Sequence, residues 1–181
     1  MNLKLKEMTT TAIFTALTAI LAQISIPLPF SPVPITFQIL AVYISAVILG
    51  SKLGALSQLV YVLLGAVGVP VFANFHGGLS VILGPSGGYL ITYPIIAYFI
   101  GKISEKELSF VKSIIGLIIS LIFCYAIGVL QLSFITKITI EKAIIVGALP
   151  FIPLDTVKII IAYILGSRVR ETLIKTNLIK C

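Results

Sequence analysis

The chain has 181 residues, of which 59% are hydrophobic and only 10% are charged, and its mean hydropathy is +1.17. A chain this apolar is too poor in polar residues for a soluble domain, so we expect one integral membrane domain over residues 1–181. The net charge is +7, and the basic residues that produce it are scattered over short segments without interleaved aromatic residues. This pattern argues against nucleic-acid binding and favours contact with anionic lipid.

The apolar segments are separated by proline, glycine or charged residues, and they predict an all-α fold with six transmembrane helices. The expected spans are Thr9–Ile26, Ile35–Gly50, Leu53–Gly68, Gly88–Gly101, Phe110–Leu132 and Leu149–Gly166. Several are shorter than the ~20 residues that a perpendicular helix needs, so we expect them to extend into loops or to end inside a cavity. The first segment lacks a small-residue cleavage site and runs into Pro27, so we interpret it as a retained helix rather than a signal peptide.

Basic residues are distributed unevenly between the two sides of this six-helix arrangement. One side carries Lys4, Lys6, Lys52, Lys102, Lys106, Lys112, Arg168, Arg170, Lys175 and Lys180, whereas the other side carries only Lys137 and Lys142. Cytoplasmic loops of membrane proteins are enriched in Lys and Arg, so we expect both termini in the cytoplasm. The segments around residues 27–38 and 69–90 then face outward.

The two cysteines and the single histidine support neither a disulfide framework nor a metal site. Cys124 lies in the middle of the fifth span and Cys181 is the C-terminal residue, so the two thiols are not expected to meet. His76 lies in an outer loop, where we expect a solvated side chain rather than a ligand. We therefore expect no bound metal.

The two outward segments have an unusual composition. Residues 27–34 contain four prolines, which predict a stiff and extended lid that cannot become helical. Gln38 follows at the outer end of the second span, where its amide can face a pocket. Residues 69–90 contain glycines that permit tight turns and a close approach to a ligand. They lack the GxxxxGK[ST] pattern of a phosphate-binding loop.

Asp155 and Lys158 lie three residues apart in the sixth span, which is otherwise almost entirely apolar. A charge at the centre of a membrane helix costs roughly 2.5–3.5 kcal/mol on insertion scales, so such residues usually face a partner, a cavity or a substrate. The i, i+3 spacing puts both side chains on one helical face. Pro153 suits a first helical turn, which would put Asp155 near the free N–H groups of the helix start. Either the pair only pins helices together, or it binds a small polar ligand; we favour the ligand.

Three motifs carry a family resemblance. Pro-Val-Pro-Ile-Thr-Phe-Gln (32–38), Gly-Pro-Ser-Gly-Gly-Tyr-Leu (84–90) and Leu-Pro-Phe-Ile-Pro-Leu-Asp-Thr-Val-Lys (149–158) resemble the BioY family in order and spacing. These proteins are the biotin-capture S components of energy-coupling-factor (ECF) transporters. The chain departs from the family pattern at Ser86, where Thr is common, and at Leu154, where Gly is common.

The resemblance implies a six-helix S-component fold that holds biotin near the outer face of the cell membrane, beneath the loop between the first two spans. It implies that Asn74, Asp155 and Lys158 hold the ligand head group. Weaker pocket candidates are Tyr89, Gln38, Phe37, Phe151, Gly87 and Gly88. The resemblance leaves open whether Lys158 meets the ureido carbonyl or the valerate carboxylate of biotin.

Ala12 and Ala16 form a small-residue pair in the first span, with Thr15 and Ala19 extending the stripe. The resemblance implies that small residues of this helix dock onto a transmembrane coupling subunit, which is shared with two cytoplasmic ATPases. The chain itself contains no Walker motif, so ATP hydrolysis is assigned to these partners. The alternatives are an S component for a different vitamin, an intramembrane enzyme, and a pore or scaffold without saturable ligand binding. An enzyme is disfavoured because the chain lacks a convincing nucleophile–base set.

Overall fold

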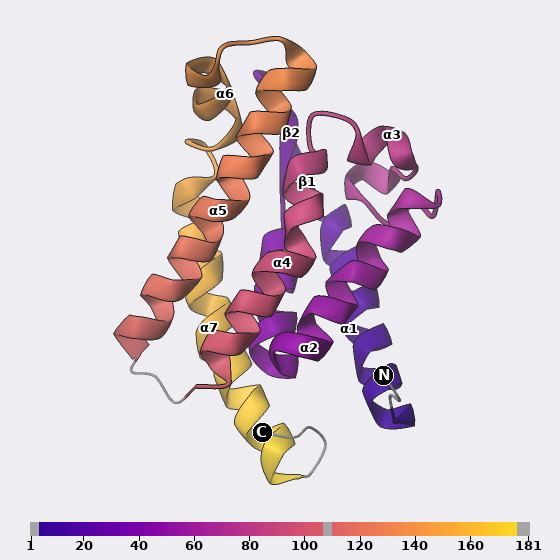
Figure 1. Cartoon of the computed structure of the whole chain (residues 1–181), viewed down its shortest axis with the longest axis vertical. Helices are drawn as coiled ribbons and strands as arrows, with labels where there is room; N and C mark the ends of the chain where they lie inside the picture. Colours follow the sequence, from indigo (N-terminus) through magenta and orange to yellow (C-terminus); the bar gives the residue numbers. More distant parts are fainter. Residues whose placement is uncertain (1–3, 107–109, 177–181) are drawn as a thin grey trace.

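The computed structural model describes residues 4–106 and 110–176 (Figure 1). Helices dominate it, and a short antiparallel sheet and several short helices lie at its upper end. The elements in chain order are α1 (Leu5–Gln23), β1 (Ser25–Leu28), β2 (Ser31–Thr36), α2 (Gln38–Ala66), the 3-10 helix η1 (Ala73–Phe75), α3 (Leu79–Ile82), α4 (Gly87–Ser104), α5 (Phe110–Thr136), α6 (Ile140–Gly147) and α7 (Ile152–Lys175). Residue Cys181 lies outside the described residues.

The proline-rich segment is extended, as its composition predicted. β1 and β2 form a hairpin in which Ser25 pairs with Thr36 and Leu28 pairs with Ser31. The same hairpin corrects the first two expected spans at their facing ends. Pro27 disfavours helical backbone in the residue before it, so Ile26 belongs to β1 and α1 already ends at Gln23.

Helix α2 is two antiparallel limbs rather than one straight helix. Gly50 has φ 80° and ψ −174°, a conformation that is strongly disfavoured for every residue except glycine, and the chain reverses there. Figure 1 shows one limb descending from β2 and the other rising toward α3. The limbs pack closely, because a Cβ atom on Gly54 would lie 2.8 Å from the Cα atom of Ala46. The second and third expected spans therefore correspond to the two limbs.

Charges bracket this reversal at the lower end of the molecule. Arg170 of α7 is buried and donates a hydrogen bond to the carbonyl of Ile48 at 2.9 Å, near the end of the first limb. The Glu105 carboxylate accepts hydrogen bonds from the backbone N–H and the hydroxyl of Ser51, at 2.7 and 2.8 Å, at the start of the second limb. A cation at a helix C-terminus and an anion at a helix N-terminus both oppose the helix dipole, so the pair stabilises the turn.

Glu105→Gln should therefore destabilise the fold in a pH-dependent way. Burial opposes the charge, but hydrogen bonds from Ser51 and the nearby Lys102 ammonium outweigh it and hold the pKa of Glu105 below its ordinary value of 4.5. Because the folded pKa is lowered, the stabilisation is complete above the unfolded pKa and is lost as the pH falls through the folded pKa. Thermal unfolding midpoints of wild type and variant in detergent should differ most at neutral pH and converge below pH 4.5.

Glu171→Gln is the matched control for that measurement. Glu171 pairs with Lys175 at 2.7 Å on the exposed surface of α7, and exposed ion pairs contribute little to stability. An equal loss in both variants, or a loss in Glu105→Gln that does not change with pH, would contradict the role given to the Glu105 carboxylate.

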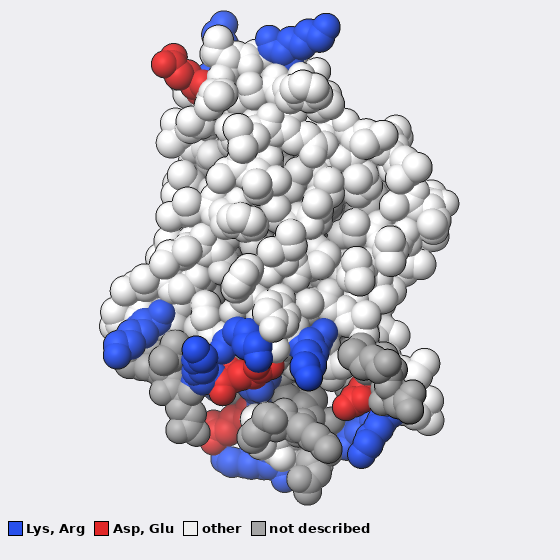
Figure 2. Space-filling model, viewed as in Figure 1, with Lys and Arg blue, Asp and Glu red and all other residues white. Residues whose placement is uncertain are grey.

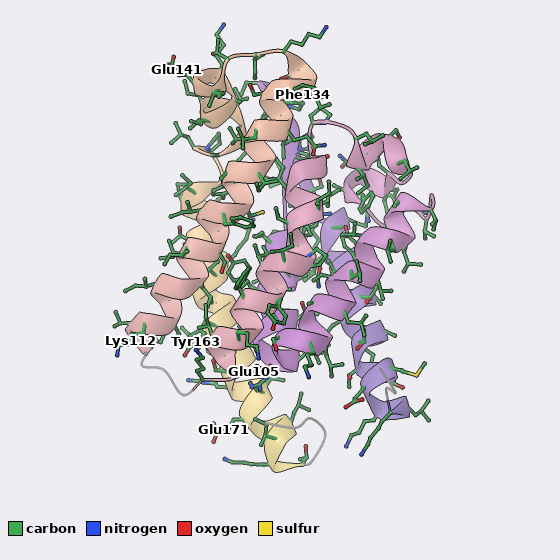
Figure 3. All side chains as sticks on the ribbon, viewed as in Figure 1. Glu105, Lys112, Phe134, Glu141, Tyr163 and Glu171 are labelled. Atoms are coloured by element: carbon green, nitrogen blue, oxygen red, sulfur yellow. The ribbon has the colours of Figure 1, made fainter. Side chains whose placement is uncertain are left out.

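The charge distribution and the length of the helices fit a membrane protein. Figure 2 shows a broad belt without Lys, Arg, Asp or Glu on the visible face, between charged groups at the two ends. In Figure 3, Glu141 lies at the upper end, and Lys112 and Glu171 lie toward the lower end. Within the described residues, and by length and composition alone, α2 and α5 each suffice to cross a membrane, and so does the bent pair α6 and α7 if it forms one span. The length of α2 includes both limbs.

Candidate ligand-binding site

A cavity of about 180 Å³ lies between the β1–β2 hairpin, the loop containing η1 and the first turns of α4 and α7. Figure 1 shows these elements toward the upper end of the molecule. It is lined by both apolar and polar side chains. The lining residues are Pro32, Val33, Pro34, Thr36, Gln38, Ile39, Phe72, Ala73, Asn74, His76, Val81, Ser86, Tyr89, Leu90, Tyr93, Cys124, Tyr125, Gly147, Phe151 and Asp155.

Asp155 is the acidic group of the cavity wall. Pro153 occupies the first turn of α7, as its position predicted, and Asp155 lies in the same turn with 7% of its surface exposed. One carboxylate oxygen, Oδ1, accepts a hydrogen bond from Lys158 Nζ at 2.8 Å, and Oδ2 accepts one from the Tyr125 hydroxyl at 2.8 Å. The shared helical face of Asp155 and Lys158 is confirmed, and Tyr125 of α5 gives the carboxylate a second hydrogen-bond donor.

Lys158 supports the cavity wall from behind. Its ammonium also donates a hydrogen bond to the carbonyl of Thr36 at 2.8 Å and lies 5.3 Å from the centroid of the Phe37 ring. Neither Lys158 nor Phe37 is among the lining residues named above. The ammonium therefore ties α7 to the end of β2 while it neutralises Asp155, and such a buried pair is stable only when its remaining hydrogen-bonding capacity is met.

The polar contacts continue from Thr36 to the loop that precedes η1. The Thr36 hydroxyl donates to Gln38 Oε1 at 3.1 Å, and Gln38 Nε2 donates to the Tyr61 hydroxyl at 2.6 Å. That hydroxyl donates in turn to the carbonyl of Val71 at 3.1 Å. We call the connected set the cavity network; it comprises Tyr125, Asp155, Lys158, Thr36, Gln38, Tyr61 and the Val71 carbonyl. It joins α5, α7, β2 and α2 around the cavity.

Asn74 lines the same cavity from the η1 loop. It has φ 57° and ψ 34°, the left-handed region that Asn tolerates better than most residues, and its side chain is exposed. His76 also lines the cavity, and its Nδ1 lies 3.0 Å from the carbonyl of Ala73. The structure thus brings Asn74 and Asp155 to one cavity.

Apart from Phe37, which contacts Lys158 outside the lining, the weaker pocket candidates divide into two groups. Gln38, Tyr89 and Phe151 line the cavity, and the Tyr89 hydroxyl donates to the carbonyl of Gly147 at 2.8 Å. Gly87 and Gly88 instead permit close packing at the start of α4. A Cβ atom on Gly88 would lie 2.7 Å from the carbonyl oxygen of Ile127, and one on Gly87 would overlap the carbonyl of Ile82.

Sequence reasoning missed Tyr125, Tyr61 and Tyr93. Each lies within a long apolar segment, where an aromatic residue is usually read as packing or as an interface anchor. Only the position of Tyr125 opposite Asp155 reveals its role, and no spacing in the sequence predicts that contact. Among the described residues, no group of three or more His, Cys, Asp and Glu side chains is placed to hold a metal ion.

The cavity is suited to a small ligand with a neutral polar group. The buried charges form a neutralised pair, whereas carboxylate, amide and phenol groups provide both hydrogen-bond acceptors and donors. Aromatic and aliphatic side chains cover the rest of the wall. An apolar ligand would leave the remaining acceptor capacity of the Asp155 carboxylate unused, and a highly charged ligand would need a counter-charge that the pair does not offer.

The alanine pair of α1 lies away from the cavity, on the outside of the bundle. Ala12 and Ala16 are exposed, whereas Thr15 is buried and donates a hydrogen bond to the carbonyl of Ser57 at 2.9 Å. Thr15 therefore belongs to the inward face of α1, which corrects its assignment to the same stripe. The exposed face also carries large apolar side chains, of which Ile13 is 57% exposed.

Comparison with known proteins identifies the family. The model of the BioY family matches residues 1–175. The chain belongs to the BioY family. The resemblance read from the three motifs is thereby confirmed over nearly the whole chain.

Relatives and a solved structure agree with this assignment. The biotin transporter BioY of Thermotoga maritima is 43% identical over 167 residues, which cover 92% of this chain and 97% of the relative. The probable biotin transporter BioY of Pyrococcus horikoshii is 43% identical over 168 residues, covering 93% and 98%. The crystal structure of the S-component for biotin from an ECF-type ABC transporter aligns with a TM-score of 0.84 and 32% identity, covering 92% of this chain and 91% of that one.

Proposed function

We propose that this chain captures biotin and serves as the substrate-binding subunit of an ECF-type transporter that takes up biotin. The observation that carries the proposal is a cavity lined by both Asn74 and Asp155, in a chain of the BioY family that resembles a solved S-component for biotin. The chain is a transport subunit rather than an enzyme.

The chemistry of the biotin head group fits this wall. The ureido ring offers two N–H donors and one carbonyl acceptor. Asp155 can accept from an N–H group while Lys158 and Tyr125 hold its carboxylate, and the Asn74 amide can either donate or accept. Lys158 would meet the ligand only if its ammonium turned from Thr36 toward the cavity. Tyr89, Gln38 and Phe151 would enclose the rest of the molecule.

Equilibrium binding to the purified protein tests the proposal. Biotin should bind saturably, and riboflavin and thiamine should neither bind with comparable affinity nor displace it. Preferred binding of another vitamin would retain the S-component role and overturn the substrate. Absence of saturable binding by any of the three would favour a scaffold and overturn the proposal.

The proposed arrangement in the membrane has six spans, formed by α1, the two limbs of α2, α4, α5 and α7. The basic residues of the lower end support a cytoplasmic position for both termini and an outward position for the cavity. Lysines at the lower end would also meet anionic lipid headgroups.

Cysteine labelling in intact cells should report this orientation. We expect His76→Cys to react with an impermeant thiol reagent because its loop is exposed and outward, whereas Lys112→Cys, at the start of α5, should stay protected until the membrane is permeabilised. A Cys181→Ser background removes the C-terminal thiol, and the remaining Cys124 is buried. The reverse labelling pattern would invert the arrangement and place the cavity on the wrong side for uptake.

Energy for uptake would come from partners. We propose that Ala12 and Ala16 dock onto a transmembrane coupling subunit, which works with two cytoplasmic ATPases that hydrolyse ATP. The exposure of both alanines supports this role, because small residues on an outward helix face allow a second helix to approach closely.

A further inference from the structure

Gln23, the last residue of α1, is hydrogen-bonded to the backbone of the loop that carries Asn74. Its Nε2 donates to the carbonyls of Phe72 and Val71, at 3.1 and 3.3 Å, and shares its two N–H groups with the carbonyl of Ala19 in its own helix, at 3.1 Å. Its Oε1 accepts a hydrogen bond from the N–H of Phe75 at 2.8 Å. The amide therefore contacts the loop on both sides of Asn74. A side-chain amide suits this task because it donates and accepts at the same time.

The loop is closed by its own backbone, since the N–H of Phe72 donates to the carbonyl of His76 at 3.0 Å, and Gln23 adds support from outside. Asn74 and Phe75 both have φ 57°, and a bulky residue such as Phe rarely adopts this left-handed conformation. Phe75 is 72% exposed, so packing of its side chain does not hold it in place. Phe72 is 1% exposed and packs edge-on against Tyr61, which anchors only the start of the loop.

Two different helices thus hold the loop by its carbonyls. The Val71 carbonyl accepts hydrogen bonds from both Gln23 of α1 and Tyr61 of α2. Tyr61 belongs to the cavity network that reaches Asp155. Only Gln23, among the side chains with described contacts to this backbone, also binds the N–H that follows Asn74.

We infer that Gln23 is a positioning residue, which holds the Asn74 amide in the geometry that binds ligand and thereby sets affinity without touching the ligand. The inference rests on the proposed biotin site. Gln23 does not line the cavity, and it lies at the end of α1, the helix that also carries the proposed docking residues Ala12 and Ala16. The inference therefore gives α1 a second role, in ligand affinity.

A double-mutant cycle tests the inference. Gln23→Met keeps the approximate length of the side chain and removes all of its hydrogen bonds to the loop. We expect it to weaken biotin binding by about tenfold in the wild-type background and to have almost no further effect in an Asn74→Ala background, because the two residues act through one contact. Equal losses in both backgrounds would mean that Gln23 supports the fold in general, and would overturn the inference.

Gln131→Met is the matched control. Gln131 of α5 also donates its Nε2 to loop carbonyls, those of Ile82 at 2.8 Å and Gly84 at 2.9 Å, but its loop does not carry Asn74. Any effect of this variant on biotin binding should add to that of Asn74→Ala. Coupling as strong as that of Gln23→Met would overturn the specific role of Gln23.

Hydrogen exchange gives a second measurement, which does not depend on ligand. The peptide containing Phe75 should exchange faster in ligand-free Gln23→Met than in wild type, and at the wild-type rate in Gln131→Met. Where Gln23→Met does not fold, Gln23→Asn replaces it, since its amide is one methylene short of the loop. If the Gln23 variant exchanges at the wild-type rate and binds biotin with wild-type affinity, the inference is overturned, but the biotin site stands because wild type still binds biotin. Wild type that does not bind biotin would overturn both.

Discussion

Asp155→Asn should weaken biotin binding by roughly 2–5 kcal/mol, the usual range when one member of a desolvated charged pair is removed. The carboxylate accepts hydrogen bonds from both Lys158 and Tyr125. An Asn side chain would turn its NH₂ group toward one of these two donors. It would also leave the Lys158 ammonium buried without its counter-charge. Titration calorimetry on the folded variant measures the loss. Lys158→Ala should lose affinity in the same range, because it leaves the buried carboxylate unpaired.

Lys142→Ala is the control for these two variants. Lys142 also lies at the upper end, but it is exposed and far from the pair in the chain. Its removal changes the net charge by the same amount as Lys158→Ala and should leave biotin affinity nearly unchanged. Near wild-type affinity in folded Asp155→Asn would remove Asp155 from the binding site.

Ala16→Leu should abolish most energised uptake while it leaves biotin binding by the isolated protein intact. Ala16 lies on the exposed face of α1, so a larger side chain there has room in the isolated subunit but would hold a docking helix away. Biotin affinity, co-purification with the coupling subunit and uptake by cells should be measured on the same variant.

Ala126→Leu is the matched control, since Ala126 is an exposed alanine on a different helix, α5. It should leave both binding and uptake unchanged. If Ala16→Leu lowers biotin affinity together with uptake, Ala16 packs against other helices of this chain and is not a docking residue. If neither changes, Ala12 and Ala16 are not the docking surface.

The elements with strong local constraints could be predicted from the sequence. Four prolines in residues 27–34 leave the backbone little choice but extension, and this much was predicted, whereas the antiparallel pairing of β1 with β2 was not. The first turn of α7 was likewise set by Pro153, and the spacing of Asp155 and Lys158 fixed their common face. Local chemistry decides all three features, so no knowledge of the rest of the fold was needed.

The remaining features depend on contacts between distant segments. Tyr125 meets Asp155 only because α5 packs beside α7, and Gln23 meets the η1 loop only because α1 ends beside it. Thr15 was assigned to the wrong face of α1 because a small residue in an apolar helix carries no sign of which side is buried. Helix ends were also misplaced where Pro27 ended α1 early.

The cavity network includes two main-chain carbonyls as acceptors, those of Thr36 and Val71. Every residue type supplies a carbonyl, so these two links would survive replacement of either side chain, although the Thr36 hydroxyl makes a separate contact to Gln38. The other links need particular side chains, which are those of Tyr125, Asp155, Lys158, Thr36, Gln38 and Tyr61. Over evolutionary time, position 71 should therefore drift freely among apolar residues, whereas a change at position 61 should be accompanied by a change at position 38.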